Sequence, residues 1–309
     1  MGSILLISQT ALELGFQYAL VAMALFLSYR VLDIADLTTD GGFVLGAAVS
    51  VTVTAAGHPF LAIPAAMAAG ACAGFVTAFL QTRLGVPSIL AGIVTNTGLY
   101  TVNLMVMGWR SNASLLGKDT VFILFKDLGV FGDWSNVALS AAVTVLAGAL
   151  LYLFLGTRLG LSIRATGDNR DMVRASSINP TFTIAVGLCI SNALTSLSGA
   201  VVGQAQRSAD INSGTGIVVI GLACLIIGET FLGRRSVLKG VIAVMVGSIV
   251  YRFIYAIALY TRVVPVEGLK LLTAAIVGLS IAAPTIRGWV GFESRKLRSS
   301  RRAAAKGGD

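Results

Sequence analysis

Two carboxylates and two hydroxyls stand together in an otherwise apolar part of the chain. Asp36, Thr38, Thr39 and Asp40 lie in one short stretch, directly before a pair of glycines. Carboxylates can hold an ammonium group and hydroxyls can bind a polar solute, and ionisable side chains within a membrane face a cavity or the interior of a helix bundle. These four residues are therefore predicted to line a path for a solute. The alternative is a turn at the cytoplasmic surface.

A second polar set follows the spacing of a helix. Asn96, Tyr100 and Asn103 recur every three or four residues in an apolar segment, so they share one helical face. This face suits an aromatic or zwitterionic solute, although the two asparagines can instead hydrogen-bond a neighbouring helix. Asn192, in a later apolar segment, has the same two alternatives. On the first interpretation all four residues line the path.

Two charged residues lie in later apolar segments. Arg252 is about 15 residues into the segment 237–257, near its expected outer end, where a long side chain can reach the membrane interface. The minority hypothesis is that Arg252 receives a substrate carboxylate. Glu229 is close in sequence to Arg234 and Arg235, so a structural ion pair is expected there.

Several chemistries are excluded by the residues that are missing. The sequence has no Gly-x-x-x-x-Gly-Lys-[Ser/Thr] phosphate loop, so ATP hydrolysis by that route is excluded. The single histidine, His58, is a poor basis for a catalytic triad. The cysteines at 72, 189 and 224 stand apart in apolar stretches, which indicates neither a disulfide framework nor a metal site. The chain is predicted not to be an enzyme and to carry no metal or cofactor.

The composition is that of a membrane protein. Of the 309 residues, 56% are hydrophobic and 12% are charged, whereas soluble proteins are about 25% charged. A transmembrane helix needs roughly 20 apolar residues, and the sequence predicts an all-α, polytopic bundle of about eight to ten such helices. The nine candidate spans are 12–32, 37–57, 60–80, 88–108, 137–156, 182–203, 215–231, 237–257 and 268–286.

The second and seventh spans are the least regular. The second opens with the polar stretch 36–42, which is too polar to face lipid as a regular helix. Non-helical backbone at membrane depth is tolerated only where it is buried in protein or lines a wet cavity. The second element is therefore predicted to be broken or re-entrant.

Small residues predict close helix packing. Gly70 with Gly74, and Gly199 with Gly203, form two Gly-x-x-x-Gly pairs in the third and sixth spans. Small residues let helix backbones approach closely in a membrane, where lipid supplies no hydrophobic drive for association. The pairs indicate packing and say nothing about function.

Basic residues give the orientation, because short cytoplasmic loops are enriched in Lys and Arg. The formal net charge is +9, and seven of the 23 basic residues fall between Arg287 and the end of the chain. We therefore divide the chain into one transmembrane domain, 1–287, and a basic cytoplasmic tail, 288–309. The charge-balanced stretch 109–136 is expected outside, as is the N-terminus. A basic tail after an apolar span favours anionic lipid over nucleic acid as its partner.

The basic connection 157–181 is expected to contain a short cytoplasmic helix, at about 168–177. Asp168 or Asn169 can cap its start, and Asn179-Pro180 ends it because the residue before a proline disfavours helical geometry. Arg170 and Arg174 share its charged face. Met172, Val173 and Ala175 supply a small apolar surface that a soluble partner could bind. The alternative is a solvated loop.

Several motifs carry a family resemblance. The run from Gly167 to Asn179 leads into an apolar span ending Leu-Ser-Gly-Ala at 197–200, and Ser-Gly-Thr-Gly at 213–216 precedes Ile-Gly-Leu-Ala. Together with 33–42 and 233–241, they resemble the permease subunits of bacterial ABC importers of the branched-chain amino acid and ribose type, over roughly residues 15–285. More narrowly, 90–93, 98–100, 103–104 and 116–120 are similar to the subgroup serving tryptophan or tyrosine-like substrates.

The resemblance implies a multi-pass permease of the bacterial plasma membrane, a non-catalytic subunit that pairs with a second copy of itself. It implies an extracytoplasmic binding protein as solute donor and a separate cytoplasmic ATPase dimer, which binds ATP and Mg. Asp168 and Ser177 stand where the sugar branch often has glycine. The residues to which the resemblance gives the ATPase-coupling role are Asp168, Asn169, Arg170, Asp171, Met172, Val173, Arg174 and Ser177.

Other functions stay open at the level of sequence. The solute is expected to be an amino acid, with aromatic amino acids among the candidates, but a ribose-like sugar or a branched-chain amino acid fits the same family. Outside it, the alternatives are an ATPase-independent secondary carrier or channel, and a membrane anchor that only recruits the binding protein.

Overall fold

The computed structural model describes residues 2–127, 129, 132–233 and 236–260, together with the single positions 271, 274, 275, 278 and 282. The ninth predicted span, 268–286, is thus covered only at those five positions. The basic tail, 288–309, lies outside the described residues.

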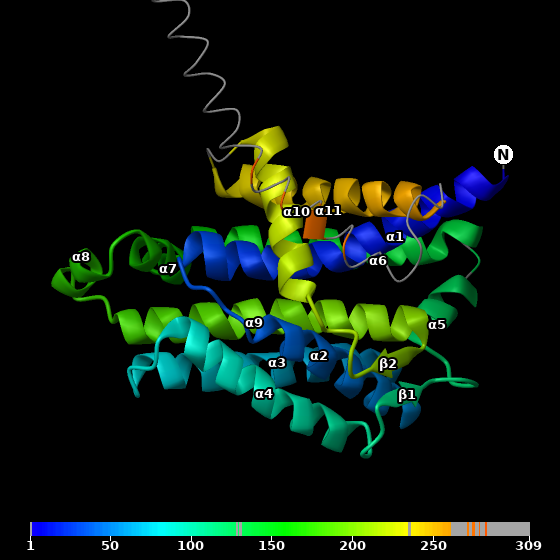
Figure 1. Cartoon of the computed structure of the whole chain (residues 1–309), viewed down its shortest axis with the longest axis horizontal. Helices are drawn as coiled ribbons and strands as arrows, with labels where there is room; N and C mark the ends of the chain where they lie inside the picture. The colour runs from blue at the N-terminus through cyan, green and yellow to red at the C-terminus, as the bar shows by residue number, and fades with distance from the viewer. Residues whose placement is uncertain are drawn as a thin grey trace, which may run out of the picture.

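The described part is almost entirely helical, as predicted (Figure 1). Each of the first eight predicted spans corresponds to helical structure, and all but the first agree to within about three residues at each end; the first, 12–32, corresponds to α1 and η1 and begins ten residues earlier, at Gly2. The elements are α1 (Gly2–Leu25), η1 (Phe26–Val31), α2 (Thr39–Ala55), α3 (Pro59–Thr82), α4 (Ser88–Val106), β1 (Asn112–Ser114), α5 (Val121–Asp127), η2 (Gly132–Trp134), α6 (Ser135–Gly156), α7 (Arg158–Asp168), α8 (Arg170–Ala175), α9 (Pro180–Gln206), β2 (Ser208–Asp210), α10 (Ile217–Leu232) and α11 (Val237–Tyr260).

Six helices of the described part are long and apolar enough to cross a membrane. They are α1 continued by η1, α3, α4, α6, α9 and α11. The two spans singled out as irregular are the shorter apolar helices, α2 and α10. The chain is therefore a multi-pass membrane protein in which two of the apolar helices span less than the full bilayer.

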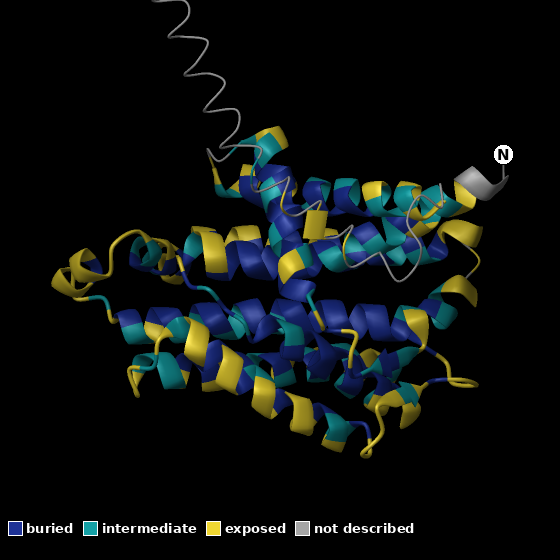
Figure 2. Ribbon diagram, in the orientation of Figure 1, coloured by how far each residue is buried: buried dark blue, intermediate teal, exposed yellow. Residues whose placement is uncertain are grey.

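Helix α9 lies at the centre of the bundle. It packs against α1, α2 and α3, and Figure 2 shows it as an almost continuously buried ribbon. Figure 1 shows α7 and α8 projecting at one end, and β1, β2 and α5 at the other. We call these the α8 end and the β end.

Glycines set the closest helix contacts, as the two Gly-x-x-x-Gly pairs predicted. Gly70 and Gly74 of α3 lie against the backbone carbonyls of Asn192 and Leu188 in α9. Gly199 of α9 lies against the carbonyl of Phe43 in α2. A methyl group at any of these three glycines would overlap a carbonyl oxygen of the neighbouring helix.

The second element was predicted to be broken, but α2 is an unbroken helix from Thr39 to Ala55, and the irregular backbone lies in the connection before it. The α-helical backbone of α1 gives way to a π-helix, η1, and residues 33–36 then have no regular structure before α2 begins at Thr39. Leu32, Ile34, Asp36 and Thr38 in this connection are buried. Burial inside the protein is what permits irregular backbone among apolar helices.

A small antiparallel β-sheet at the β end was not predicted. Strands β1 and β2 pair Asn112 with Asp210 and Ser114 with Ser208. Each strand has only three residues, with no alternating apolar pattern to mark it. The pairing joins segments about 100 residues apart, a proximity created by the helices rather than by the strands themselves.

We predict that Gly199→Ala lowers the stability of the detergent-solubilised chain by about 1–3 kcal/mol, because the added methyl group overpacks the contact with Phe43. The matched control is Gly98→Ala in α4, where an added Cβ meets nothing within 4 Å. Thermal unfolding followed by tryptophan fluorescence measures both. Equal unfolding temperatures for the two variants would contradict the packing assignment.

Candidate functional site

The first carboxylate of the polar stretch belongs to an internal hydrogen-bond network. Asp36 Oδ1 accepts from the backbone N–H of Thr38 at 2.9 Å, and its Oδ2 accepts from Asn192 Nδ2 at 2.7 Å. The Thr38 hydroxyl lies 2.8 Å from that of Thr77 in α3. Asp36, Thr38, Thr39 and Asn192 are all buried. Thr38 thus holds the start of α2 against α3, the Asp36–Asn192 bond holds it against α9, and the Thr39 hydroxyl donates within the same stretch, to the carbonyl of Asp36.

The second carboxylate holds the start of another helix. Asp40, in the first turn of α2, accepts from the backbone N–H of Gly216 at 3.2 Å and from that of Val218 at 2.9 Å. Those groups belong to the first turn of α10 and would otherwise lack partners, since the first N–H groups of a helix have none within it. Carboxylates are favoured there because a helix N-terminus carries partial positive charge. The starts of α2 and α10 thus meet at Asp40.

The remaining predicted path residues come together in one hollow of about 380 Å³. Asp40, Asn96, Tyr100 and Asn103 all line it, and we call it the α2/α4 groove. The groove therefore brings together one predicted path residue from the start of α2 and three from a face of α4. Its other lining residues are Gly41, Val44, Thr97, Ile211, Gly214 and Thr215.

The segment 211–215 lines this groove, but it was not among the predicted path residues. The only signal for it in the sequence was the Ser-Gly-Thr-Gly motif, which served as a family marker. Gly214 is required there because a Cβ would overlap the backbone carbonyl of Asp40.

The groove has one carboxylate and, among its described lining residues, no cation. Asn103 is 1% exposed; its Nδ2 donates to the carbonyl of Gly41 at 3.1 Å, while its Oδ1 has no partner within the described structure. Tyr100 is 53% exposed and presents an aromatic ring. These groups suit a ligand with a positively charged hydrogen-bond donor and an apolar or aromatic part.

Arg252, expected to reach the membrane interface, packs inside the described helix bundle. The residue is 8% exposed, and its guanidinium carbon lies 3.6 Å from the ring centroid of Tyr18 in α1. Helix α11 packs along α1, so the side chain meets an aromatic face instead of solvent, an attraction of cation–π type. Arg252 is not among the residues that line the groove.

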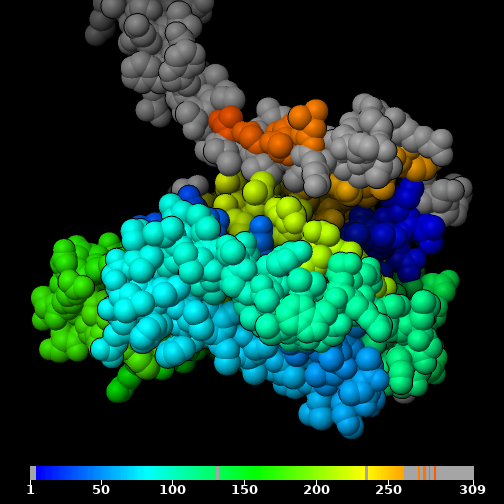
Figure 3. Space-filling model, turned by 60° about the horizontal axis from the view of Figure 1, so that its bottom comes forward, coloured from blue at the N-terminus to red at the C-terminus, as the bar shows by residue number. Residues whose placement is uncertain are grey.

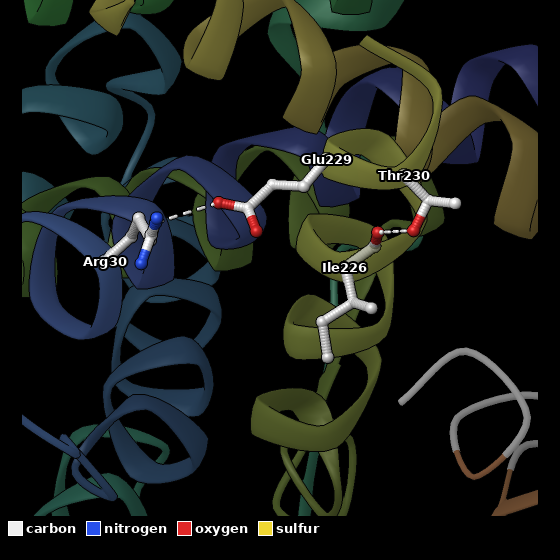
Figure 4. Close-up of polar contacts among 4 residues, drawn as sticks. All are labelled: Arg30, Ile226, Glu229 and Thr230. Atoms are coloured by element: carbon white, nitrogen blue, oxygen red, sulfur yellow. Dashed lines mark hydrogen bonds and ion pairs between the residues drawn. The ribbon is translucent and has the colours of Figure 1, made fainter. Parts of the chain in front are cut away.

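A hollow at the α8 end is built around an ion pair. Arg30 Nε of η1 lies 3.0 Å from Glu229 Oε1 in the last turn of α10 (Figure 4). Figure 4 also shows the Thr230 hydroxyl bonded to the carbonyl of Ile226, within α10. Arg164 and Asp168 of α7 line the same hollow, of about 270 Å³. The expected partners of Glu229, at 234 and 235, lie outside the described residues.

The connection after α6 contains two helices where one was predicted. The break occurs at Asn169, whose Oδ1 accepts from the N–H groups of Asp171 and Met172, each at 3.0 Å, and so caps α8. Helix α8 ends at Ala175, with Ser177 in the left-handed region at φ 61°. Asn179 does not end α8; its side chain instead caps α9.

The exposed residues of α8 differ from those expected in one respect. Val173 is 1% exposed and anchors α8 to the protein, so it cannot form part of an accessible apolar surface. Met172 is 56% exposed. The other predicted coupling residues are also exposed: Asp168, Asn169, Arg170, Asp171, Arg174 and Ser177.

Helix α7 connects α8 to the bundle. Its Gly167 packs against the carbonyl of Val31 in η1, and the hydroxyls of Thr166 and Thr183 lie 2.8 Å apart, joining α7 to α9. A force applied at α8 would therefore pass to η1 and α9. Elsewhere in the described structure, no group of three or more His, Cys, Asp or Glu residues is placed to hold a metal ion.

The chain is similar to known transport proteins. Residues 8–279 match the family model described as the permease component of the branched-chain amino acid transport system. A tyrosine transport system permease protein of Clostridioides difficile is 34% identical over 84% of this chain and 85% of its own length. The ribose import permease protein of Escherichia coli K12 is 27% identical over 72% of this chain and 67% of its own.

One solved structure shares the fold. It is described as a metal-chelate type ABC transporter in an inward-facing conformation, and it matches 91% of this chain and 85% of its own with a TM-score of 0.50. The sequence identity is 14%. At that level the likeness concerns the helix arrangement alone.

We predict that Asn192→Ala destabilises the chain by about 1.5–3 kcal/mol, because it removes a hydrogen bond to the buried carboxylate of Asp36. In an Asp36→Asn background the same change should cost clearly less, since the charged acceptor is gone. Unfolding temperatures of the four proteins form the double-mutant cycle. An equal cost in both backgrounds would show that Asp36 and Asn192 are not coupled.

Proposed function

Because this chain belongs to the family of permease components of branched-chain amino acid transport systems, we propose that it is the membrane subunit of an ATP-driven importer for an amino acid. The match over residues 8–279 supports the transporter class. The observation that supports an amino acid as the cargo is the lining of the α2/α4 groove. It contains a carboxylate, an unpartnered amide oxygen and an aromatic ring. The experiment that tests both is transport by the purified subunits in liposomes.

The orientation follows from charge. Arg158, Arg164, Arg170 and Arg174 all lie at the α8 end, which we assign to the cytoplasm because short inner loops are rich in basic residues. The β end and the N-terminus then face outward. On this assignment the tail 288–309 is cytoplasmic, and the chain spans the inner membrane of a bacterium.

The ATPase docks on α8 and drives transport through this contact. A cytoplasmic ATPase dimer binds ATP and Mg, and this chain contributes a docking surface rather than a catalytic group. Met172 is the exposed apolar contact, and Arg170 and Arg174 flank it with positive charge. The ties of α7 to η1 and α9 carry the motion of the ATPase into the bundle.

Helix α10 links the two sites. Its first turn is capped by Asp40 in the groove, and its last turn carries Glu229, paired with Arg30 next to α7. A shift of η1 driven from α8 therefore reaches Asp40 along a single short helix. This arrangement supports alternating exposure of the groove in step with ATPase closure.

The groove favours an amino acid over a sugar. A carboxylate has about four lone-pair sites, and Asp40 uses two of them on backbone N–H groups, so it can still accept from an ammonium. Asn103, which also lines the groove, has a buried Oδ1 without a partner in the described structure as a second acceptor, and Tyr100 can pack against an apolar or aromatic side chain. A binding protein delivers the solute at the β end, and a second copy of the chain completes the transporter.

We predict that the double substitution Arg170→Glu, Met172→Glu abolishes co-purification of the ATPase, because it reverses charge and removes the exposed apolar contact of α8. Arg83→Glu is the control, since Arg83 is an exposed arginine of the same end that lies after α3 and outside α8. Unchanged recovery of the ATPase with the double variant would overturn the coupling assignment.

We predict no uptake of tyrosine by the chain alone in liposomes, and ATP-dependent uptake once the ATPase and binding protein are added. Asp40→Asn should then lower the uptake rate about tenfold or more, since a hydrogen bond to a charged group is worth about 1.5–3 kcal/mol. Thr97→Ala, in the same groove, is the matched control.

Uptake without the ATPase would instead establish a secondary carrier. Asp40→Asn also changes the cap of α10, so its unfolding temperature is measured alongside. Tyr100→Ala, at an exposed position, gives a second variant that leaves the fold intact. Ribose uptake that exceeds tyrosine uptake would contradict the cargo assignment.

A further inference from the structure

The largest of the described hollows near the α8 end has no role in the path. It lies between α6, α7 and the start of α11 and measures about 700 Å³. Tyr152, Leu153, Thr157, Arg164, Ser236 and Leu238 are among the residues that line it. We call it the α6/α11 groove.

One end of this groove is polar and cationic. Arg164 of α7 is exposed and opens into it, beside the hydroxyl residues Thr157 and Ser236. Within the described part of the chain Arg164 forms no ion pair, and Asp168, which borders the adjoining hollow with it, is not bonded to it. Two further exposed cations, Arg158 and Lys239, are the chain neighbours of lining residues.

The apolar lining residues Leu153 and Leu238 share helix faces with further exposed apolar side chains outside the groove. Leu146, Leu150 and Leu153 are exposed on one face of α6, at helical spacing. Leu238 and Ile242 are exposed one turn apart at the start of α11. A cationic, hydroxyl-lined end followed by two apolar strips matches the order of groups in a phospholipid, a phosphate followed by acyl chains.

We propose that the α6/α11 groove binds one anionic phospholipid from the leaflet at the α8 end. The phosphate lies on Arg164, whose planar guanidinium can donate two parallel hydrogen bonds to phosphate oxygens. The acyl chains lie along the leucines of α6 and the apolar residues of α11. Basic pockets between transmembrane helices are the kind of site that anionic lipid headgroups occupy.

The site has a consequence for α8. Arg164 lies in α7, which is joined to α8 through the single residue Asn169. A lipid held by Arg164 and by α6 and α11 would fix the height of α7 relative to the membrane surface. The binding site itself does not depend on the proposed transport function.

The test is native mass spectrometry of the full-length chain, purified in detergent and mixed with equal amounts of phosphatidylglycerol and phosphatidylcholine. The wild type should retain phosphatidylglycerol in preference. Arg164→Gln should lower that retention about fivefold, which is the effect of one basic residue near an anionic lipid surface. Arg83→Gln, at an exposed arginine of the same end outside the groove, should behave as wild type.

A second variant tests the apolar half. Leu153→Trp should lower retention of both lipids by filling the groove where the acyl chains lie, with an unfolding temperature close to that of the wild type. Equal retention of the two lipids by the wild type, or wild-type retention by Arg164→Gln, would overturn the proposal. So would the absence of retained lipid in the wild type, which would indicate that another segment, such as 268–286, covers the groove.

Discussion

The structure depends on how two helices can begin inside a membrane-embedded bundle. The first N–H groups of α2 and α10 have no hydrogen-bond partners within their own helices. Among apolar side chains they need acceptors from the protein itself. Asp36 and Asp40 supply acceptors for these groups from within the same short stretch of chain. The break before α2, the placement of α10 and the existence of the α2/α4 groove all follow from that arrangement.

The helices could be predicted from sequence because their signal is local. Apolar runs of sufficient length located the first eight spans, seven of them nearly to their ends, and the polar stretch 36–42 marked the irregular connection before α2. The roles of Asp36 and Asp40 could not be read in this way, because Asn192 and Gly216 lie about 150 residues or more away in the chain. The contact of Arg252 with Tyr18 could not be predicted for the same reason, because the two residues are far apart in the chain. That the groove and α8 serve transport stays a prediction.

Close and loose packing are unevenly distributed in the bundle. Helices α2 and α3 each meet α9 through glycines that leave no room for a methyl group. Helix α4, by contrast, leaves much of its surface uncovered, and Figure 3 shows it on the face turned forward. Asn96 and Tyr100 therefore border the groove from a helix that is less tightly packed than α2 or α9.

Asp40 has consequences for anyone who would redesign this protein to carry a different cargo. The same two oxygens that face the groove also hold the start of α10, so replacing this side chain changes selectivity and architecture at once. Tyr100 and Thr97 are better positions for a library of variants. Tyr100 is largely exposed, and the Thr97 hydroxyl bonds only within its own helix, to the carbonyl of Ile93. Variation of the cargo is thus more accessible on α4 than on α2.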